Sequence, residues 1–177
     1  VLDRSLVDSL DRADIVYSWG VLHHTGEMWR AIENAASTMK DDGVFYVALY
    51  TSDIYIDPPP GYWIALKQRY NRAGALRRRL MEWSYAWRYT IRPEIKAGKN
   101  PWKVIRNYGE SRGMAFWSDV RDWLGGWPME FAGIAETIRF CRERLGLELL
   151  HMWAGEANTE YLFARAGTRT YFHDVIA

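Results

Sequence analysis

The chain has 177 residues, 49% of them hydrophobic and 25% charged, with a net charge of +1, and this balance excludes a disordered or fibrous chain. No apolar run reaches the ~18 residues of a membrane-spanning helix, and the N-terminal residues lack the basic-then-apolar pattern of a secretory signal. The single cysteine, Cys141, cannot form an internal disulfide, so we expect a cytoplasmic protein of one domain or slightly more.

The first third of the chain has the pattern of a strand, a helix and a second strand. Residues 14–18 form a short, β-branched apolar run, which is typical of a buried strand. Thr25 is a candidate cap for a helix over residues 28–39, which the sequence Asp41-Asp42-Gly43 is expected to break. A continuous apolar run at residues 44–50 predicts another strand, and this order favours a parallel sheet with a right-handed crossover.

A proline-rich break at residues 57–61 separates this unit from a helical segment. Helices are predicted over residues 62–72 and 75–89, and the second is expected to end at Arg92-Pro93 because a residue before proline disfavours helical geometry. The Lys-rich stretch at residues 96–107 is predicted to be irregular or a short helix.

The last part of the chain is predicted to contain two helices and two strands. The helices cover residues 114–124 and 134–145, and Gly146 closes the second. Strands at 147–153 and 158–164 flank a turn, which indicates a hairpin.

Charge is unevenly distributed along the sequence. Residues 61–112 contain thirteen Lys or Arg against three Glu, a net +10, whereas the rest of the chain has a net charge of −9. Within this basic segment, apolar residues mark one helix face and arginines the remainder: Leu76, Leu80, Trp83 and Trp87, with Arg77, Arg78, Arg79 and Arg88. The segment could be the solvated face of a cap, a surface for an anionic membrane or, less favoured because no RNA-binding signature is present, a nucleic-acid site.

The stretch from Asp14 to Thr25, D-I-V-Y-S-W-G-V-L-H-H-T, resembles the fourth-strand motif of class I S-adenosylmethionine-dependent methyltransferases, roughly D-x-V-x-x-x-x-V-L-H-H. The helix, acidic glycine turn, strand, insertion, helix and two strands that follow match the family's order over about 100 residues. The resemblance implies an α/β fold, a partial Rossmann-like methyltransferase sheet in the order 4-5-7-6 with the last strand antiparallel, and a helical insertion. Arg112-Gly113-Met114 and the Gly125–Pro128 turn resemble quinone-methylase-like members of this superfamily.

One departure from the family pattern is important. The family's G-x-G-x-G turn after the first strand, and the acidic residue after the second, are both missing from this sequence. The resemblance therefore implies a C-terminal fragment, in which the strand at residues 14–18 forms an adhesive edge of the sheet. Its expected parts are a methyltransferase core at 1–52, a helical cap insertion at 53–133, a return to the core at 134–167 and a tail at 168–177.

The resemblance also implies the positions of a cofactor site. Ligands of α/β sheets bind beyond the carboxyl ends of the strands, and the resemblance implies that the ligand at that edge is S-adenosylmethionine. The expected cofactor-binding residues are Val1, Leu2, Ser18, Trp19, Gly20 and Val21. The alternative for Trp19 and Val21 is simple packing in the core.

Two adjacent histidines, His23 and His24, are the candidate catalytic residues; a metal site is not expected because no further ligands stand at suitable spacing. Cys141, on the apolar face of its helix, is expected to be inert. Aromatic residues after the second strand and in the insertion, with one carboxylate, are the candidate substrate-binding residues: Tyr50, Tyr62, Trp63, Trp127 and Glu130. They suit a small hydrophobic or aromatic methyl acceptor, whereas the alternative is a non-catalytic binding or scaffold module that retains half of the fold.

Overall fold

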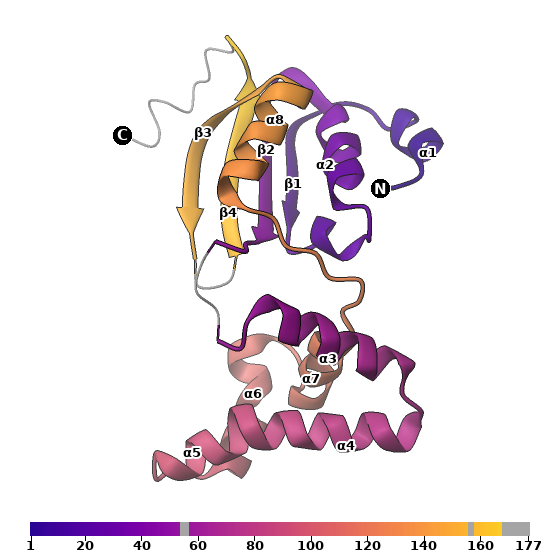
Figure 1. Ribbon diagram of the computed structural model, residues 1–177. Helices are drawn as coiled ribbons and strands as arrows, with labels where there is room; N and C mark the ends of the chain where they lie inside the picture. The colour runs from indigo at the N-terminus through magenta and orange to yellow at the C-terminus, as the bar shows by residue number, and fades with distance from the viewer. Residues whose placement is uncertain (54–56, 156–157, 168–177) are drawn as a thin grey trace. The chain divides into compact units, whose positions relative to one another are not determined.

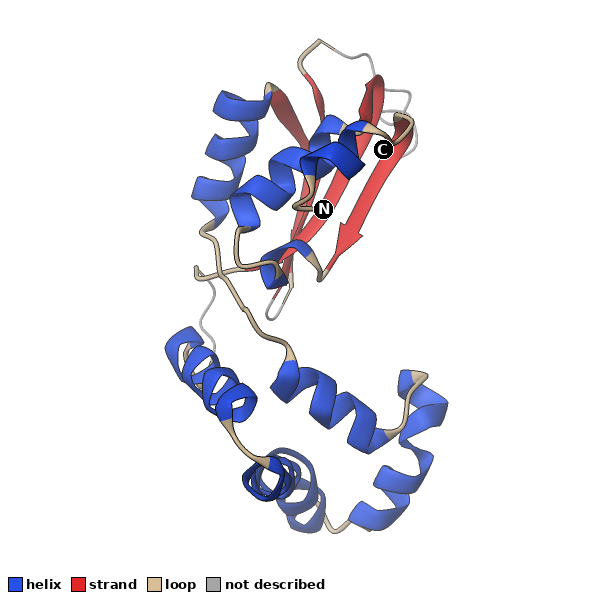
Figure 2. Cartoon of the chain, turned by 90° about the vertical axis from the view of Figure 1, so that its right-hand side faces the viewer, coloured by secondary structure: helices blue, strands red, loops and turns tan. Residues whose placement is uncertain are grey.

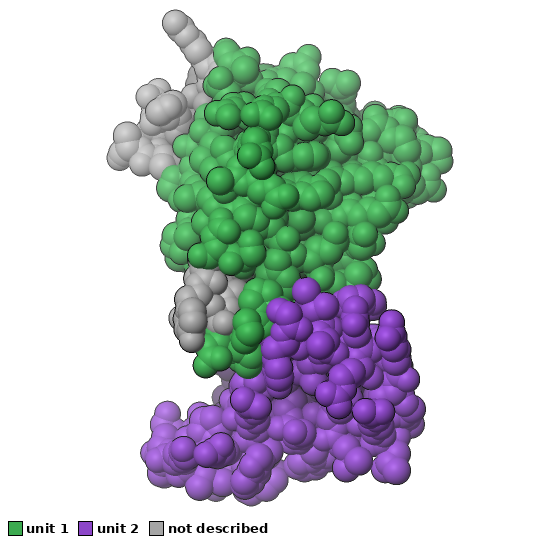
Figure 3. All heavy atoms as spheres, viewed as in Figure 1, with its two compact units in different colours: residues 1–60, 128–177 green, residues 61–127 purple. Residues whose placement is uncertain are grey.

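The computed structural model describes residues 1–53, 57–155 and 158–167 (Figure 1). The chain divides into two compact units, coloured separately in Figure 3. The sheet unit consists of Val1–Pro60 and Pro128–Ala177, and the helical unit of Gly61–Trp127. The expected tail at 168–177 and part of the turn at 154–157 lie outside the described residues.

The sheet unit contains one four-stranded sheet. Its strands are β1 (Ala13–Trp19), β2 (Met39–Tyr50), β3 (Leu147–Ala154) and β4 (Asn158–Arg165). The spatial order is β1-β2-β4-β3; β1 and β2 are parallel, and β4 is antiparallel to both of its neighbours. This is the order that the resemblance implied, with the expected antiparallel last strand and hairpin, so the predicted fold class is confirmed.

Among the described residues, three α-helices belong to the sheet unit: α1 (Arg4–Asp8), α2 (Met28–Ser37) and α8 (Ile134–Leu145). Figures 1 and 2 show α2 and α8 on the same side of the sheet. The buried core between them and the strands includes Ile32, Phe45, Cys141 and Phe163. Because side chains alternate between the faces of a strand, the odd-numbered residues of β2 from Phe45 to Leu49 point into this core.

The opposite face of the sheet exposes large apolar side chains. Ile15, Tyr17 and Trp19, which alternate along β1, are all exposed to solvent. Tyr17 stacks on Tyr46 of β2 at a centroid distance of 5.2 Å, and the hydroxyl of Tyr46 donates to the Glu160 carboxylate. Burial, together with this carboxylate, raises the pKa of Tyr46 to about 12. The sheet unit thus has one face packed by helices and one face that no described helix covers, on which β1 exposes its large side chains.

Two predictions about the α2–β2 connection are wrong. The helix ends at Ser37, two residues before its predicted end, and Met39–Gly43 belong to β2 rather than to a turn. The pairing shifts between Ala13↔Met39 and Ile15↔Val44, which leaves a bulge in β2. A Cβ at Gly43 would lie 2.8 Å from the carbonyl oxygen of Asp14, so this position requires glycine.

The helical unit consists of five α-helices and one π-helical turn among the described residues. In chain order these are α3 (Pro60–Arg72), α4 (Ala75–Ala86), the π turn (Trp87–Ile91), α5 (Arg92–Lys96), α6 (Pro101–Arg112) and α7 (Phe116–Gly125). The predicted helix end at Arg92-Pro93 is wrong, because Pro93 lies in the first turn of α5, where its missing N–H costs little. Most of the stretch predicted to be irregular or a short helix belongs to α6, whose N-cap Asn100 accepts a hydrogen bond from the Trp102 N–H.

An ionisable side chain lies inside the helical unit. Lys67 of α3 is almost fully buried; its ammonium donates to the Trp123 carbonyl and lies 4.1 Å from the centroid of the Trp123 indole. Burial lowers the pKa of Lys67 to about 8 from its ordinary 10.5. A charged lysine in this place therefore opposes folding at neutral pH.

This burial predicts a pH dependence of stability. Between the folded pKa of about 8 and the unfolded 10.5, the unfolded chain binds more protons, so the free energy of unfolding rises with pH across this window. We expect a rise of about 2 kcal/mol between about pH 8 and about pH 10 that Lys67→Met lacks. Urea unfolding at both pH values measures it, with exposed Lys99→Met as the control. An equal rise in both variants would contradict the assignment to Lys67.

Candidate functional site

The parallel strands β1 and β2 end at the same edge of the sheet, where a ligand would bind. Ser18 is buried at this edge, and the chain leaves β1 through Gly20, whose φ of 71° is left-handed. The Gly20 N–H donates to the Ala48 carbonyl of β2 over 3.2 Å, which holds the turn against the sheet. A Cβ at Gly20 would meet nothing within 4 Å, so the turn borders open space.

The side chains on either side of Gly20 are open to solvent. Trp19 is 50% exposed and Val21 is 57% exposed, so the alternative that they pack in the core is wrong. The indole N–H of Trp19 donates to the Glu160 carboxylate of β4 over 3.1 Å. This bond orients the indole at the edge where β1 ends.

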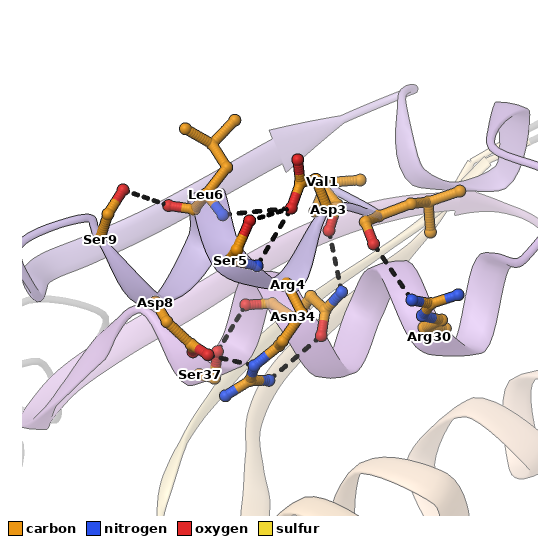
Figure 4. Close-up of polar contacts among 11 residues, drawn as sticks. Val1, Asp3, Arg4, Ser5, Leu6, Asp8, Ser9, Arg30, Asn34 and Ser37 are labelled. Atoms are coloured by element: carbon orange, nitrogen blue, oxygen red, sulfur yellow. Dashed lines mark hydrogen bonds and ion pairs between the residues drawn. The ribbon is translucent and has the colours of Figure 1, made fainter.

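Val1 and Leu2, the other expected cofactor-binding residues, are held by α2 through their backbone carbonyls (Figure 4). Asn34 donates to the Val1 carbonyl over 2.9 Å, and Arg30 donates to the Leu2 carbonyl over 3.3 Å. Leu2 also packs against the core of the sheet unit, whereas Val1 is exposed. Asn34, itself buried, therefore fixes the segment that precedes α1.

The two histidines follow Gly20 in a short 3-10 turn (Leu22–His24), and their environments differ. His23 is fully buried; its Nδ1 accepts from the Tyr50 N–H over 3.4 Å, and the Glu130 N–H donates to its carbonyl over 2.9 Å. His24 is only partly buried, and its Nδ1 lies 2.8 Å from the Pro128 carbonyl. Because a carbonyl only accepts, Nδ1 carries the proton, and a neutral His24 has its lone pair on Nε2.

Aromatic rings surround the end of β2. Tyr50 lies 4.0 Å from the His23 ring and stacks on Phe131 at 5.6 Å, measured between centroids. Phe131 was not among the sequence candidates, because it lies near the end of the expected insertion and only the fold brings it to β2. The pairing of Thr51 with Ala132 as an isolated parallel bridge holds these two segments together.

Glu130 stabilises the start of α2. Its carboxylate accepts from the Met28 N–H at 3.1 Å and 3.4 Å, where a negative charge also suits the helix dipole. The predicted cap, Thr25, is wrong: its hydroxyl donates back to the Leu22 carbonyl over 2.7 Å, and the N-cap residue is Glu27. Sequence reasoning missed this contact because Glu130 stands 102 residues away from Met28.

The other three substrate-binding candidates belong to the helical unit. Trp63 is buried there, whereas Tyr62 and Trp127 are partly exposed. Tyr62 lines a cavity of about 220 Å³ whose other lining residues are Leu66, Arg69, Met81, Ser84, Tyr85, Arg88 and Tyr89. The five substrate-binding candidates are therefore divided between the two units: Tyr50 and Glu130 belong to the sheet unit, and Tyr62, Trp63 and Trp127 belong to the helical unit.

Metal chemistry would need a cluster of ligands, and thiol chemistry would need a reactive cysteine. No group of three or more His, Cys, Asp or Glu among the described residues could hold a metal ion. Cys141 is fully buried in α8, and burial raises the pKa of its thiol to about 12. A protonated, inaccessible thiol is unreactive, as expected.

The fold resembles that of a solved structure, PKMT2 from Rickettsia typhi in complex with AdoHcy. The TM-score is 0.53 at 13% sequence identity, and the likeness covers 93% of this chain but 38% of that chain. The chain therefore has a methyltransferase-like α/β fold and spans well under half the length of PKMT2. No protein-family model and no curated protein matches the sequence.

The Glu130 contact predicts a loss of stability on neutralisation. Glu130→Gln weakens the charge-assisted bond to the Met28 N–H, so we expect the free energy of unfolding to fall by about 1 kcal/mol. Glu33→Gln, an exposed change on α2 itself, is the matched control and should cost less than about 0.5 kcal/mol. Thermal or urea unfolding measures both; equal losses would show that Glu130 has no particular role at α2.

Proposed function

We propose that the chain is part of an S-adenosylmethionine-dependent methyltransferase. The observation that carries this proposal is the turn at Gly20: a left-handed glycine with open space beside it, at the carboxyl end of a parallel strand. The segment from Asp14 to Thr25 that contains it resembles the family motif. The fold likeness to an AdoHcy-bound protein supports the same cofactor, because AdoHcy is what S-adenosylmethionine becomes after it loses its methyl group.

Bound S-adenosylmethionine would supply the methyl group of its sulfonium to a nucleophilic atom of the acceptor, and the electron pair of the broken carbon–sulfur bond would stay on sulfur. Alignment and exclusion of water supply most of the catalysis. Ser18, Trp19, Gly20 and Val21 would hold the methionine half of the cofactor, and Val1 and Leu2 would border its adenine. Where the acceptor must lose a proton, His24 is the candidate base, because His23 has no exposed surface.

We further propose that the opposite wall of the cofactor site comes from polypeptide outside this sequence. The sequence contains no G-x-G-x-G turn, and β1 lies at the edge of the described sheet with its outer face apolar and exposed. Strands that carry such a turn would pair with the outer edge of β1, and helices that connect those strands would pack over Ile15 and Tyr17. The chain would then be the C-terminal part of the complete enzyme.

The acceptor we propose is a small hydrophobic or aromatic molecule. Stacked rings at the end of β2, Tyr50 on Phe131, offer a flat apolar surface at the strand edge. In the helical unit, three tyrosines line one cavity together with Arg69 and Arg88, and the Arg88 guanidinium lies 5.5 Å from the centroid of the Tyr89 ring. The loose likeness of Arg112-Gly113-Met114 to quinone-methylase-like sequences supports an acceptor of this type.

The second candidate function is a non-catalytic binding or scaffold module. The exposed apolar face of β1 favours it, because such a face is typical of an interaction surface. Cofactor binding would favour the first function over this one.

The proposal predicts that the chain binds AdoHcy through the Gly20 turn. Gly20→Val places a branched side chain in the space beside the turn, so we expect at least tenfold weaker binding in calorimetric titration. Gly98→Val is the matched control, because Gly98 has the same φ of 71° and equally open surroundings but lies in the helical unit. Binding by the unmodified chain and the control alone supports the proposal. Equal binding by the unmodified chain and Gly20→Val would contradict the proposed site at Gly20. Absence of binding by the unmodified chain is the result expected of the scaffold function or of a fragment that lacks the opposite wall of the cofactor site.

A further inference from the structure

Helix α4 presents apolar side chains to solvent. Leu76 is 78% exposed, Leu80 63%, Trp83 45% and Trp87 of the following π turn 55%. Their spacing of four, three and four residues places them on one side of a helix. We call these four residues the exposed α4 stripe. Apolar residues at this spacing normally mark a side that a helix buries, so the exposure of these four side chains needs a cause.

The side of α4 that packs into the helical unit combines apolar and charged groups. Ala86 belongs to the apolar core of this unit, and Met81 and Tyr85 pack against that core. Glu82 and Ala86 are the buried residues of α4; Glu82 accepts from the Tyr70 hydroxyl over 2.8 Å and pairs with Arg121 at 3.5 Å. Arg78 donates to the Tyr70 carbonyl over 3.1 Å. These charge-assisted bonds fix the rotation of α4, so the apolar stripe is held outward and does not result from loose packing.

Positive charge borders the exposed α4 stripe. Arg77 and Arg88 are exposed and flank it, and Arg79 pairs only weakly with Glu82, at 3.8 Å. Glu82 is the sole acidic residue of α4, and it is buried. The outward side of α4 therefore combines leucines and tryptophans with arginines and contains no carboxylate.

We propose that the exposed α4 stripe binds the surface of an anionic lipid bilayer, with α4 lying in the plane of the membrane. Leucine and tryptophan side chains would enter the boundary between headgroups and acyl chains, while the arginines would contact lipid phosphates. No described helix is long and apolar enough to span a bilayer. A helix that lies in the plane of the membrane contacts one leaflet. A nucleic acid would pair with the arginines but would leave Leu76 and Leu80 in water.

The experiment uses the full chain and two kinds of vesicle. One is pure phosphatidylcholine, and the other contains about 30% phosphatidylglycerol, close to the charge of an anionic membrane. Co-sedimentation at low ionic strength should recover the chain with the anionic vesicles and leave it in solution with the neutral ones. Added salt should weaken the binding, because it screens the arginine–phosphate attraction.

A pair of variants locates the contact. Leu76→Ser with Leu80→Ser removes the two most exposed apolar side chains of the stripe, so partition into anionic vesicles should fall at least about tenfold. Leu6→Ser with Leu10→Ser is the matched control, since these leucines of the sheet unit are 56% and 55% exposed. Circular dichroism verifies that both variants keep their helices.

Three outcomes would overturn the proposal. The first is equal partition of the two double variants into anionic vesicles, and the second is equal binding of the chain to neutral and anionic vesicles. The third is binding of single-stranded RNA at low salt by a chain that does not bind anionic vesicles. The last would assign the basic surface to nucleic acid instead. None of these outcomes bears on AdoHcy binding at Gly20, so failure here and failure of the methyltransferase proposal are distinguishable.

Discussion

The parallel pairing of β1 with β2 is the constraint on which the sheet unit depends. Two parallel strands need a crossover between them, and α2 supplies it while covering one face of the sheet. The pairing aligns the two strand ends, so Gly20 bonds to Ala48 and His23 meets Tyr50. Antiparallel pairing would send these residues to opposite edges. Every candidate cofactor residue from Ser18 to Val21 depends on this direction of pairing.

Carboxylates from distant segments fasten the helices to this sheet. Glu130 accepts from the first N–H of α2, and Asp53 accepts from the Ile134 N–H at the start of α8. Both carboxylates lie in the segments that lead to and from the helical unit. Opening those segments would therefore uncover the N-termini of two core helices, which couples the stability of the sheet unit to the segments that leave it.

The sequence predicts most elements of the sheet unit because continuous apolar runs, such as residues 44–50, admit few alternatives. The resemblance to the methyltransferase motif adds the strand order, which periodicity alone does not contain. The predicted ends of helices and strands were wrong where tertiary contacts outweigh the local preference of the residues for helix, strand or turn. Residues 39–43 join β2 through a bulge at which Gly43 lies close to the Asp14 carbonyl. The first N–H of α2 donates to the remote Glu130 carboxylate and not to Thr25.

The candidate site could be predicted only in part. Ser18 to Val21 lie at a strand end, a position that the pattern of strand and turn already indicates. Phe131 and the structural role of Glu130 depend on contacts across more than 75 residues, which no local pattern contains. The side of α4 that faces solvent could not be predicted either. The apolar stripe is visible in the sequence, but the bonds of Glu82 and Arg78 that hold the opposite side are not.

The burial of Cys141 gives the protein an internal reporter. It is the chain's only cysteine, and it lies in the core between α8 and the sheet. An alkylating reagent can modify it only when that core opens, so the rate of thiol labelling measures the opening free energy of the sheet unit alone. The helical unit contributes no thiol to the signal, and native-state labelling can therefore separate the local stabilities of the two units in the intact chain.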